Sequence, residues 1–163
     1  MLIIFVSLLN VAAIDSSDQS KKMINASDIL LNISNEIPIN LDHVIIIGDL
    51  DATRLRTKAE YEKISPSEIE KVELLNNPIH ISPVIRITDS TFSGVINFNN
   101  TTFNESVDFS GSIFNESTYF INAKFNRNAT FWGTNFTKGA WFHDADFNGT
   151  ANFIIADFYR IAF

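Results

Sequence analysis

The second half of the chain repeats its apolar positions at alternating spacings of six and five residues. The alternation breaks only at the last step, where the spacing is five. An amphipathic helix needs spacings of three and four, so this pattern does not predict a helix. It predicts very short strands separated by corners. The repeated positions are all phenylalanines and comprise fourteen of the fifteen in the chain: Phe92, Phe98, Phe103, Phe109, Phe114, Phe120, Phe125, Phe131, Phe136, Phe142, Phe147, Phe153, Phe158 and Phe163.

Each unit places one small and one large residue on the same side of its strand. The residue two positions before each Phe is mostly small or β-branched, as in Ser112, Thr118 and Ala123. Side chains alternate across a strand, so this residue and the Phe both point inward. The residue after the Phe is often Asn or Ser, which favour turns. The same alternation of spacings continues toward the N-terminus through Ile87 and Ile81. We expect the Phe residues from Phe92 to Phe158 to form the core.

The segment FNNTTFNESVDFSGSIFNESTYFINAKFNRNATFWGTNF resembles the pentapeptide-repeat family in its Phe-centred form, and the resemblance extends over residues 81–163. It implies an all-β fold, a right-handed quadrilateral β-helix with one five-residue unit per side. Here every second unit has one extra residue. A coil should therefore take about 22 residues, and alternate corners should bulge.

Charged residues support the predicted coil length independently. Glu105 and Arg127, Glu116 and Lys138, and Lys124 and Asp146 are each 22 apart and opposite in sign. A coil of half that length would instead place like charges on adjacent strands, which is unfavourable. One pair, Lys138 and Arg160, has like charges at the full spacing.

The first half predicts a cap and an interrupted first coil. Residues 24–35 predict a short helix with Asn25 or Ser27 as N-cap, which could cover the open end of the stack. Its apolar stripe is Ile29, Leu30, Ile33 and Ile37.

The segment VIIIGDLDATRL then spaces Ile45, Leu50 and Leu55 five apart and predicts a partial first coil, with Gly48 and Thr53 at the small positions. Residues 56–78 interrupt it. Within them, Ser65 and Glu68 form a capping box that predicts a helical insertion. The repeat resumes at residues 79–81.

The N-terminal run LIIFVSLLNVAAI predicts a signal peptide cleaved after Ala13. It is short for a membrane span, which takes about 20 residues. An uncleaved membrane anchor and a terminal element of a cytosolic protein are the alternatives. The order of leader, short helix, VIIIGDL strand and Phe repeat also resembles exported pentapeptide-repeat proteins of archaea. The predicted organisation is a leader over 1–13, a linker over 14–23, a cap with partial coil and helical insertion over 24–80, and the β-helix over 81–163.

Composition narrows the classes of protein. The chain has 163 residues, 45% hydrophobic and 19% charged, which excludes a solvated disordered chain. It has no Cys, which excludes a disulfide scaffold and a thiolate metal site.

No catalytic motif, phosphate loop or cofactor motif is present in the sequence. His143, Asp144 and Asp146 are neighbours, but we interpret them as surface residues rather than metal ligands, with Asp146 paired to Lys124. We therefore expect no enzyme activity, no cofactor and no metal.

Surface chemistry offers two candidate features. Tyr119, Trp132, Trp141 and Tyr159 form a candidate contact surface, with Tyr119 and Trp141 expected to stack; the alternative is that they are ordinary surface aromatics. Nine Asn-x-Ser/Thr sequons occur, and in an exported chain they are candidate glycan acceptors. The repeat itself also creates such sequons, although it does not explain Asn25 and Asn32. The candidate acceptors are Asn25, Asn32, Asn104, Asn115 and Asn148.

Two functions follow. The first is a non-enzymatic structural or protein-binding module, secreted or on the cell surface, with an unknown protein or cell-surface partner. The partner would meet a flat face or the C-terminal coil, through which the chain could form a homo-oligomer. Membrane association is expected only if the leader is uncleaved.

The second function comes from the resemblance: a cytoplasmic DNA mimic that binds gyrase. The net charge of −7 agrees with it, but residues 81–163 hold seven acidic and five basic residues, a net of only −2. A DNA mimic needs a strongly negative rod, so the first function is preferred. The same charge balance argues against direct binding of nucleic acid.

Overall fold

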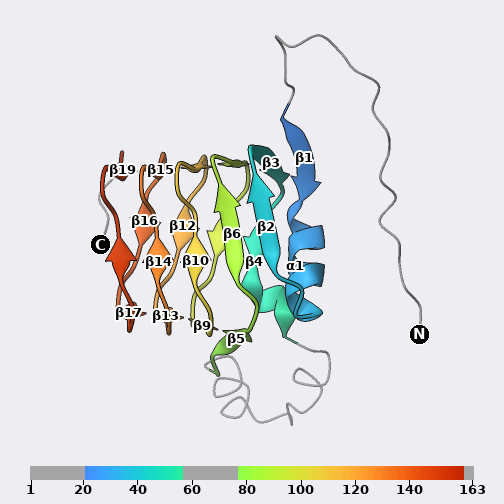
Figure 1. Cartoon of the computed structure of the whole chain (residues 1–163), viewed down its shortest axis with the longest axis vertical. Helices are drawn as coiled ribbons and strands as arrows, with labels where there is room; N and C mark the ends of the chain where they lie inside the picture. The colour runs from blue at the N-terminus through green and yellow to red at the C-terminus, as the bar shows by residue number, and fades with distance from the viewer. Residues whose placement is uncertain (1–20, 57–76, 160–163) are drawn as a thin grey trace, which may run out of the picture.

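The computed structural model describes residues 21–56 and 77–159, which form a solenoid of parallel strands (Figure 1). The predicted leader, most of the predicted linker, the predicted helical insertion and Phe163 lie outside the described residues. The coils stack from the N-terminal cap to the C-terminal end, and their strands form four sheets.

We name the four sheets A to D. Sheet A contains β1 (Lys22–Asn25), β3 (Val44–Ile47), β7 (Thr91–Phe92), β11 (Ile113–Phe114), β15 (Asn135–Phe136) and β19 (Asp157–Phe158). Sheet B contains β2 (Ile39–Asp42), β6 (Ile85–Thr88), β10 (Val107–Asp108), β14 (Ala129–Thr130) and β18 (Ala151–Asn152). Sheet C contains β4 (Leu50–Asp51), β8 (Ile96–Asn97), β12 (Thr118–Tyr119) and β16 (Ala140–Trp141). Sheet D contains β5 (Ile79–Ile81), β9 (Thr101–Phe103), β13 (Lys124–Phe125) and β17 (Asp146–Phe147).

The register between coils matches the predicted coil length. In sheet D, Phe125 pairs with Phe103 on one side and with Phe147 on the other. In sheet A, Phe114 pairs with Phe92 and Phe136 in the same way. The predicted four-sided solenoid, with about 22 residues in each coil, is confirmed.

The interior is filled by four columns of stacked phenyl rings. Ring centroids of Phe residues one coil apart lie 4.4 to 5.7 Å from one another with near-parallel planes, from Phe92–Phe114 to Phe109–Phe131. Rings of different columns meet edge to face across the interior, as Phe120 does with Phe131. Burial falls toward the C-terminal end: nine rings are buried, three are half-buried, and Phe158 is 37% exposed. The buried rings are Phe92, Phe98, Phe103, Phe109, Phe114, Phe120, Phe125, Phe131 and Phe136, and the half-buried ones are Phe142, Phe147 and Phe153.

The corners within five-residue steps differ from those within six-residue steps in their backbone hydrogen bonds. In the five-residue steps the N–H of the third residue after a Phe donates to the carbonyl of that Phe, as Ala123 does to Phe120 at 3.1 Å. The second residue after the Phe then has a positive φ, which a type II turn requires and which Gly and Asn favour. The residues in this turn position are Asp89, Asn100, Gly111, Asn122, Gly133, Asp144 and Ile155.

A helix closes the N-terminal end of the stack. Lys22 of β1 pairs with Val44 of β3, so one coil length separates them, and α1 (Ala26–Ser34) lies within that coil. Its buried residues Ile29, Leu30 and Ile33 join the core, and α1 packs against β4 and the 3₁₀ helix η1 (Ala52–Leu55). The predicted lid is therefore confirmed. Among residues 21–56 and 77–159, no helix combines the length and hydropathy needed to cross a membrane.

The N-cap is Asn25, one of the two predicted residues, although its side chain makes no capping hydrogen bond. Two other details of the predicted cap differ from the structure. Ile37 lies beyond the end of α1 and is 47% exposed. Strand β1 begins at Lys22, inside the segment predicted as a linker, because Lys22 and Met23 pair with β3.

The first coil exists, but its predicted phase is wrong. Ile46, rather than Ile45, pairs with Phe92 and is fully buried. Leu50 pairs with Ile96, so it occupies a small position rather than a Phe position. Leu55 is half-buried in η1. The run from Val44 to Ile47 is apolar at every residue, so it offers no alternation from which to read the inward side. The repeat does resume at β5, where Ile81 pairs with Phe103.

Two of the three predicted charge pairs form. Lys138 Nζ lies 2.6 Å from Glu116 Oε1, and Lys124 Nζ lies 3.5 Å from Asp146 Oδ2. Glu105 and Arg127 make no ion pair within the part of the chain that the structure describes. Sheet B adds a pair absent from the prediction, Arg86 with Asp108 at 3.6 Å.

We expect Phe120→Ala to lower the free energy of unfolding by about 3–5 kcal/mol, because the vacated space is enclosed on all sides. Phe158→Ala is the matched control and should cost far less, since its ring is already 37% exposed. Urea unfolding followed by circular dichroism measures both. Equal losses for the two variants would contradict the burial gradient along the columns.

A charge-reversal cycle tests the register. Glu116→Lys should weaken stability slightly, and adding Lys138→Glu should restore it, with a coupling energy of about 0.3–1 kcal/mol that salt reduces. The same cycle at Glu105 and Arg127 should show no coupling, because those side chains make no ion pair. Coupling at the second pair but not at the first would contradict the observed side-chain arrangement.

Candidate functional site

Candidate functional groups lie on the outer surface of the solenoid. The interior of the described coils is occupied by phenyl rings in mutual contact from Phe92 onward and by Ile, Leu and Val before it, so its inward positions carry no polar chemistry beyond buried Ser and Thr hydroxyls. Most of these hydroxyls donate to backbone carbonyls: Ser112 Oγ donates to the carbonyl of Ile87, and Thr134 Oγ1 donates to that of Phe109. We therefore consider the corners and outer faces.

One corner between sheets B and A exposes a cluster of large apolar side chains. We call Trp132, Ile154 and Ile155 the Trp132 corner; their exposed fractions are 45%, 64% and 65%. Trp132 and Ile154 hold equivalent positions on adjacent coils, and the N–H of Gly133 donates to the carbonyl of Ile154 at 3.0 Å. The three side chains therefore share one edge of the solenoid.

Ile155 occupies a turn position that disfavours it. Its φ is 52°, whereas the residues at the same place in the two preceding coils, Gly111 and Gly133, tolerate a positive φ without strain. For a β-branched residue this conformation is a true outlier and costs of order 1–2 kcal/mol. The side chain is mostly exposed, so burial does not offset that cost. Strained residues of this kind concentrate at functional surfaces.

The other predicted contact aromatics divide into a pair and a single residue. Tyr119 and Trp141 stack on sheet C as predicted, with centroids 4.7 Å apart, and both are half-buried. Trp141 also covers Gly139, where an added Cβ would lie 3.1 Å from the indole ring. Tyr159 is 69% exposed and follows β19 of sheet A. The predicted contact surface is therefore not continuous, and the stacked pair serves packing at least in part.

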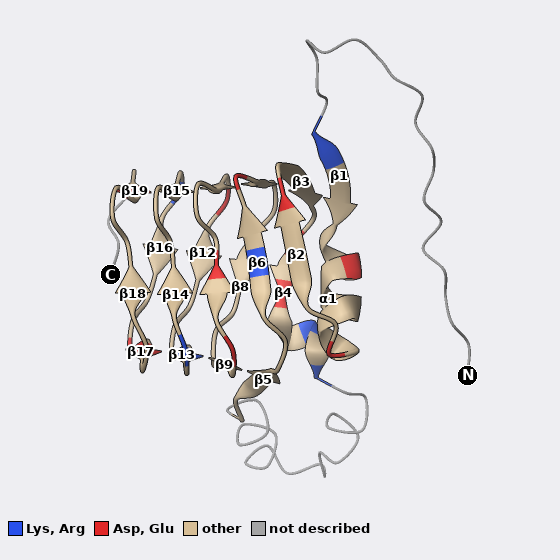
Figure 2. Ribbon diagram, viewed as in Figure 1, with Lys and Arg blue, Asp and Glu red and all other residues tan. Residues whose placement is uncertain are grey.

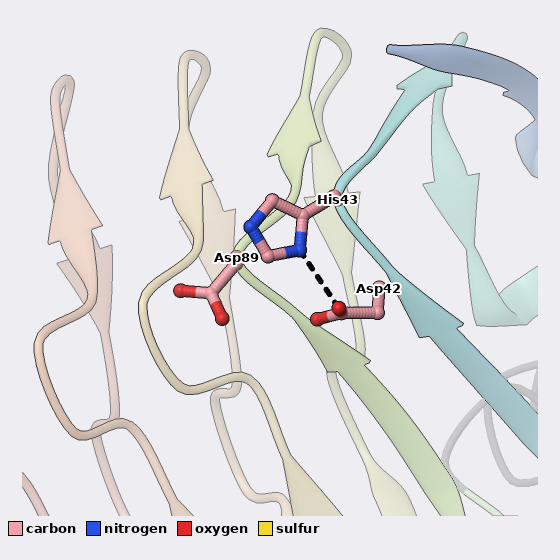
Figure 3. A group of neighbouring side chains, drawn as sticks. All are labelled: Asp42, His43 and Asp89. Carbon is pink, nitrogen blue, oxygen red and sulfur yellow. Dashed lines mark hydrogen bonds and ion pairs between the residues drawn. The ribbon is translucent and has the colours of Figure 1, made fainter. Parts of the chain in front are cut away.

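A polar cluster occupies the same B–A corner at the N-terminal end of the solenoid (Figure 3). Ligand atoms of Asp42, His43 and Asp89 lie within 4.8 Å of one another, and all three residues are exposed. Asp42 accepts a hydrogen bond from Thr88 Oγ1 at 2.6 Å, and His43 Nδ1 lies 2.7 Å from its other oxygen. The hydrogen bond from Thr88, followed by that from His43, lowers the pKa of Asp42.

These contacts give Asp42 a structural role at the end of β2. Two carboxylates and an imidazole are also a donor set that a divalent cation accepts, although exposed acidic groups commonly occur without one. The sequence did not indicate the cluster, because His43 and Asp89 are far apart along the chain. The histidine that it did single out, His143, lies 3.1 Å from Asp144, while Asp146 lies near Lys124.

The N-terminal end also carries an apolar groove of about 570 Å³ between β1, α1 and β2. Met23, Leu31 and Leu41 contribute to its lining, and Lys22 and Asp28 provide charged groups. Nothing in the described residues shows what would occupy this groove.

The predicted glycan acceptors divide into two groups. Asn25, Asn32 and Asn115 are exposed. Asn104 and Asn148 belong to a ladder of amides on successive coils: Asn126 Nδ2 donates to Asn104 Oδ1 at 3.3 Å, and Asn148 Nδ2 donates to Asn126 Oδ1 at 3.2 Å.

We expect Ile155→Asn to raise the free energy of unfolding by about 1 kcal/mol, because Asn tolerates the positive φ that this turn position requires. Ile154→Asn is the matched control: its side chain is equally exposed but its φ is not positive, so relief of strain cannot act there. Urea titration of both variants measures the difference. Destabilisation by Ile155→Asn would show that the Ile155 side chain is worth more to the fold than its backbone strain costs.

Comparison with known families agrees with this geometry. Residues 98–146 match the family model described as Pentapeptide repeats (9 copies). No curated protein and no solved structure matches the chain. The matched segment lies inside the Phe columns, and the same register continues on both sides of it, from β6 and β7 before it to β18 and β19 after it. Residues 98–146 of this solenoid therefore match the pentapeptide-repeat family, and they lie within a four-sided β-helix of about 22 residues per coil.

Proposed function

We propose that this chain is a non-enzymatic binding module that acts outside the cytoplasm, and that the Trp132 corner is where it meets a partner protein. A pentapeptide-repeat solenoid is in general a repeat module whose surface rather than its interior meets other molecules. The proposal goes further by giving this chain a location and a contact surface.

The observation that carries the proposal is the exposed apolar Trp132 corner. Tryptophan dominates the binding energy of many protein interfaces, and clustered exposed apolar side chains mark interaction sites. The chain keeps an isoleucine at position 155 although Gly, Asn or Asp occupies the equivalent turn position in other coils. A contact with an apolar partner surface would compensate for that cost.

The N-terminal sequence supports export. Its apolar run of about 13 residues has the length of a signal-peptide core, with small residues before the predicted cleavage after Ala13. This support comes from the sequence alone, because residues 1–20 lie outside the described part of the chain.

The distribution of charge along the solenoid does not favour the DNA-mimic alternative. Figure 2 shows acidic and basic residues of the described chain on the same solenoid, without a continuous acidic stripe in this view. Three acidic residues of the coils lie beside basic ones: Asp108 near Arg86, Glu116 near Lys138 and Asp146 near Lys124. Pairing of this kind reduces the negative potential that mimicry of a DNA backbone requires.

A photo-crosslinking amino acid at position 132 tests the contact surface. In living cells of the source organism, irradiation should convert the protein into an adduct of one discrete higher mass. The same probe at Arg127, which is exposed at a different corner, should give none. Ile154→Ser should reduce the yield at position 132. No adduct at position 132, or equal adducts at both positions, would contradict the proposed surface.

Fractionation of the same cells tests the location. The full chain should appear outside the cytoplasm with a new N-terminus after Ala13. A cytoplasmic chain that retains Met1 would overturn the proposal of export and leave the crosslinking result to be explained by a cytoplasmic partner.

A further inference from the structure

Three of the nine sequons present an asparagine amide that nothing in the fold uses. Asn25, Asn32 and Asn115 are exposed, and within the described chain their side chains have no hydrogen-bond partner. The hydroxyl residue of two of these sequons, Ser27 after Asn25 and Ser34 after Asn32, is exposed as well.

In several sequons within the repeat, the asparagine or the hydroxyl residue is instead hydrogen-bonded to the backbone or buried. Asn99 Oδ1 accepts the N–H of Ile121 at 2.9 Å, and Asn128 Oδ1 accepts that of Thr150 at 3.1 Å. The Oδ1 of Asn135 is buried. The hydroxyl residues of the Asn99 and Asn100 sequons, Thr101 and Thr102, are buried.

The amide ladder disfavours Asn148 as an acceptor. Its Nδ2 donates one of its two hydrogens to Asn126 Oδ1, so a sugar on that nitrogen would crowd the hydrogen bond that joins two stacked coils. Asn104 Oδ1 accepts from Asn126 Nδ2, and Asn104 is half-buried, so its amide is less accessible than those of Asn25, Asn32 and Asn115. A glycan at either position would disturb the amide ladder.

We propose that Asn25, Asn32 and Asn115 are N-glycosylation sites, and that the ladder residues Asn104 and Asn148 are not. This inference rests on the proposed export, since sequons are modified outside the cytoplasm. The co-reactant is a lipid-diphosphate-linked oligosaccharide, transferred by a membrane oligosaccharyltransferase. The amide Nδ2 attacks the anomeric carbon, the bond from that carbon to the diphosphate oxygen breaks, and the electron pair leaves with the lipid diphosphate. The amide loses one proton to a base, and nothing is oxidised or reduced.

The placement of the three sites fits such a modification. Asn25 and Asn32 lie at the start and on the outer surface of α1, which closes the N-terminal end of the stack. Asn115 follows β11 at a six-residue corner, where the next strand begins only at Thr118. None of the three belongs to the Trp132 corner, so glycans would leave the proposed contact surface bare.

The test uses the full chain purified from cells of the source organism, with each fraction analysed by intact mass and by mass spectrometry of its peptides. Peptides that contain Asn25, Asn32 and Asn115 should carry a glycan mass, and those with Asn104 and Asn148 should not. Asn115→Gln should remove one glycan from the intact mass and leave the urea midpoint of the protein unchanged. Asn148→Gln is the matched control and should leave the glycan count unchanged while lowering the midpoint.

The outcomes separate this inference from the proposed function. A chain outside the cytoplasm whose mass equals that of its polypeptide overturns glycosylation and leaves export intact. Glycans on Asn104 or Asn148 would contradict the inference that residues of the amide ladder are not glycosylated. A chain confined to the cytoplasm with Met1 retained overturns the proposed location and the glycosylation together.

Discussion

Stacking of identical side chains at a fixed interval is the constraint on which this molecule depends. Parallel strands lie about 4.8 Å apart, and the phenyl rings of successive coils stack at nearly the same interval, 4.4 to 5.7 Å. A ring fits only where the coil above and the coil below offer a ring or an apolar residue in the same position. The backbone ladder and the ring columns thus impose the same register. A shift of one residue along a strand would break the backbone pairing and the ring stacking together.

The same constraint explains what the sequence revealed and where it stopped. Between positions 92 and 158 every position recurs one coil later without interruption, so the Phe columns, the Glu116–Lys138 pair and the Tyr119–Trp141 stack could all be predicted by counting. The Glu105–Arg127 pair could not be settled in this way, because counting places two residues on adjacent coils but says nothing of how long side chains bend at a wide corner.

Counting fails where the period is interrupted. Strands β2 to β4 precede their partners β6 to β8 by more than two coil lengths, and the additional chain falls between η1 and β5. The sequence placed the interruption at residues 56–78 but did not fix the phase of the coil before it, so Ile46 could not be aligned with Phe92, nor His43 with Asp89. Trp132 was predicted as a contact residue, but its neighbours Ile154 and Ile155 in the Trp132 corner were missed for another reason. Gly111 and Gly133 mark a turn position with positive φ, and Ile155 holds the equivalent position in the coil after Gly133, so that signal was present in the sequence but was not used.

Departures from the repeat are therefore the informative positions of this chain. The register dictates a Phe, a small residue or a turn former at most places, and residues that obey it are explained by folding alone. Ile155 violates the turn rule while remaining exposed, and Asn25 and Asn32 carry sequons that the repeat does not generate. Asn115 obeys the repeat, yet its amide takes no part in a ladder, unlike that of Asn126. Since folding gains nothing from an exposed isoleucine in a left-handed turn or from an unbonded amide, their contribution must be sought in what the solenoid meets at its surface.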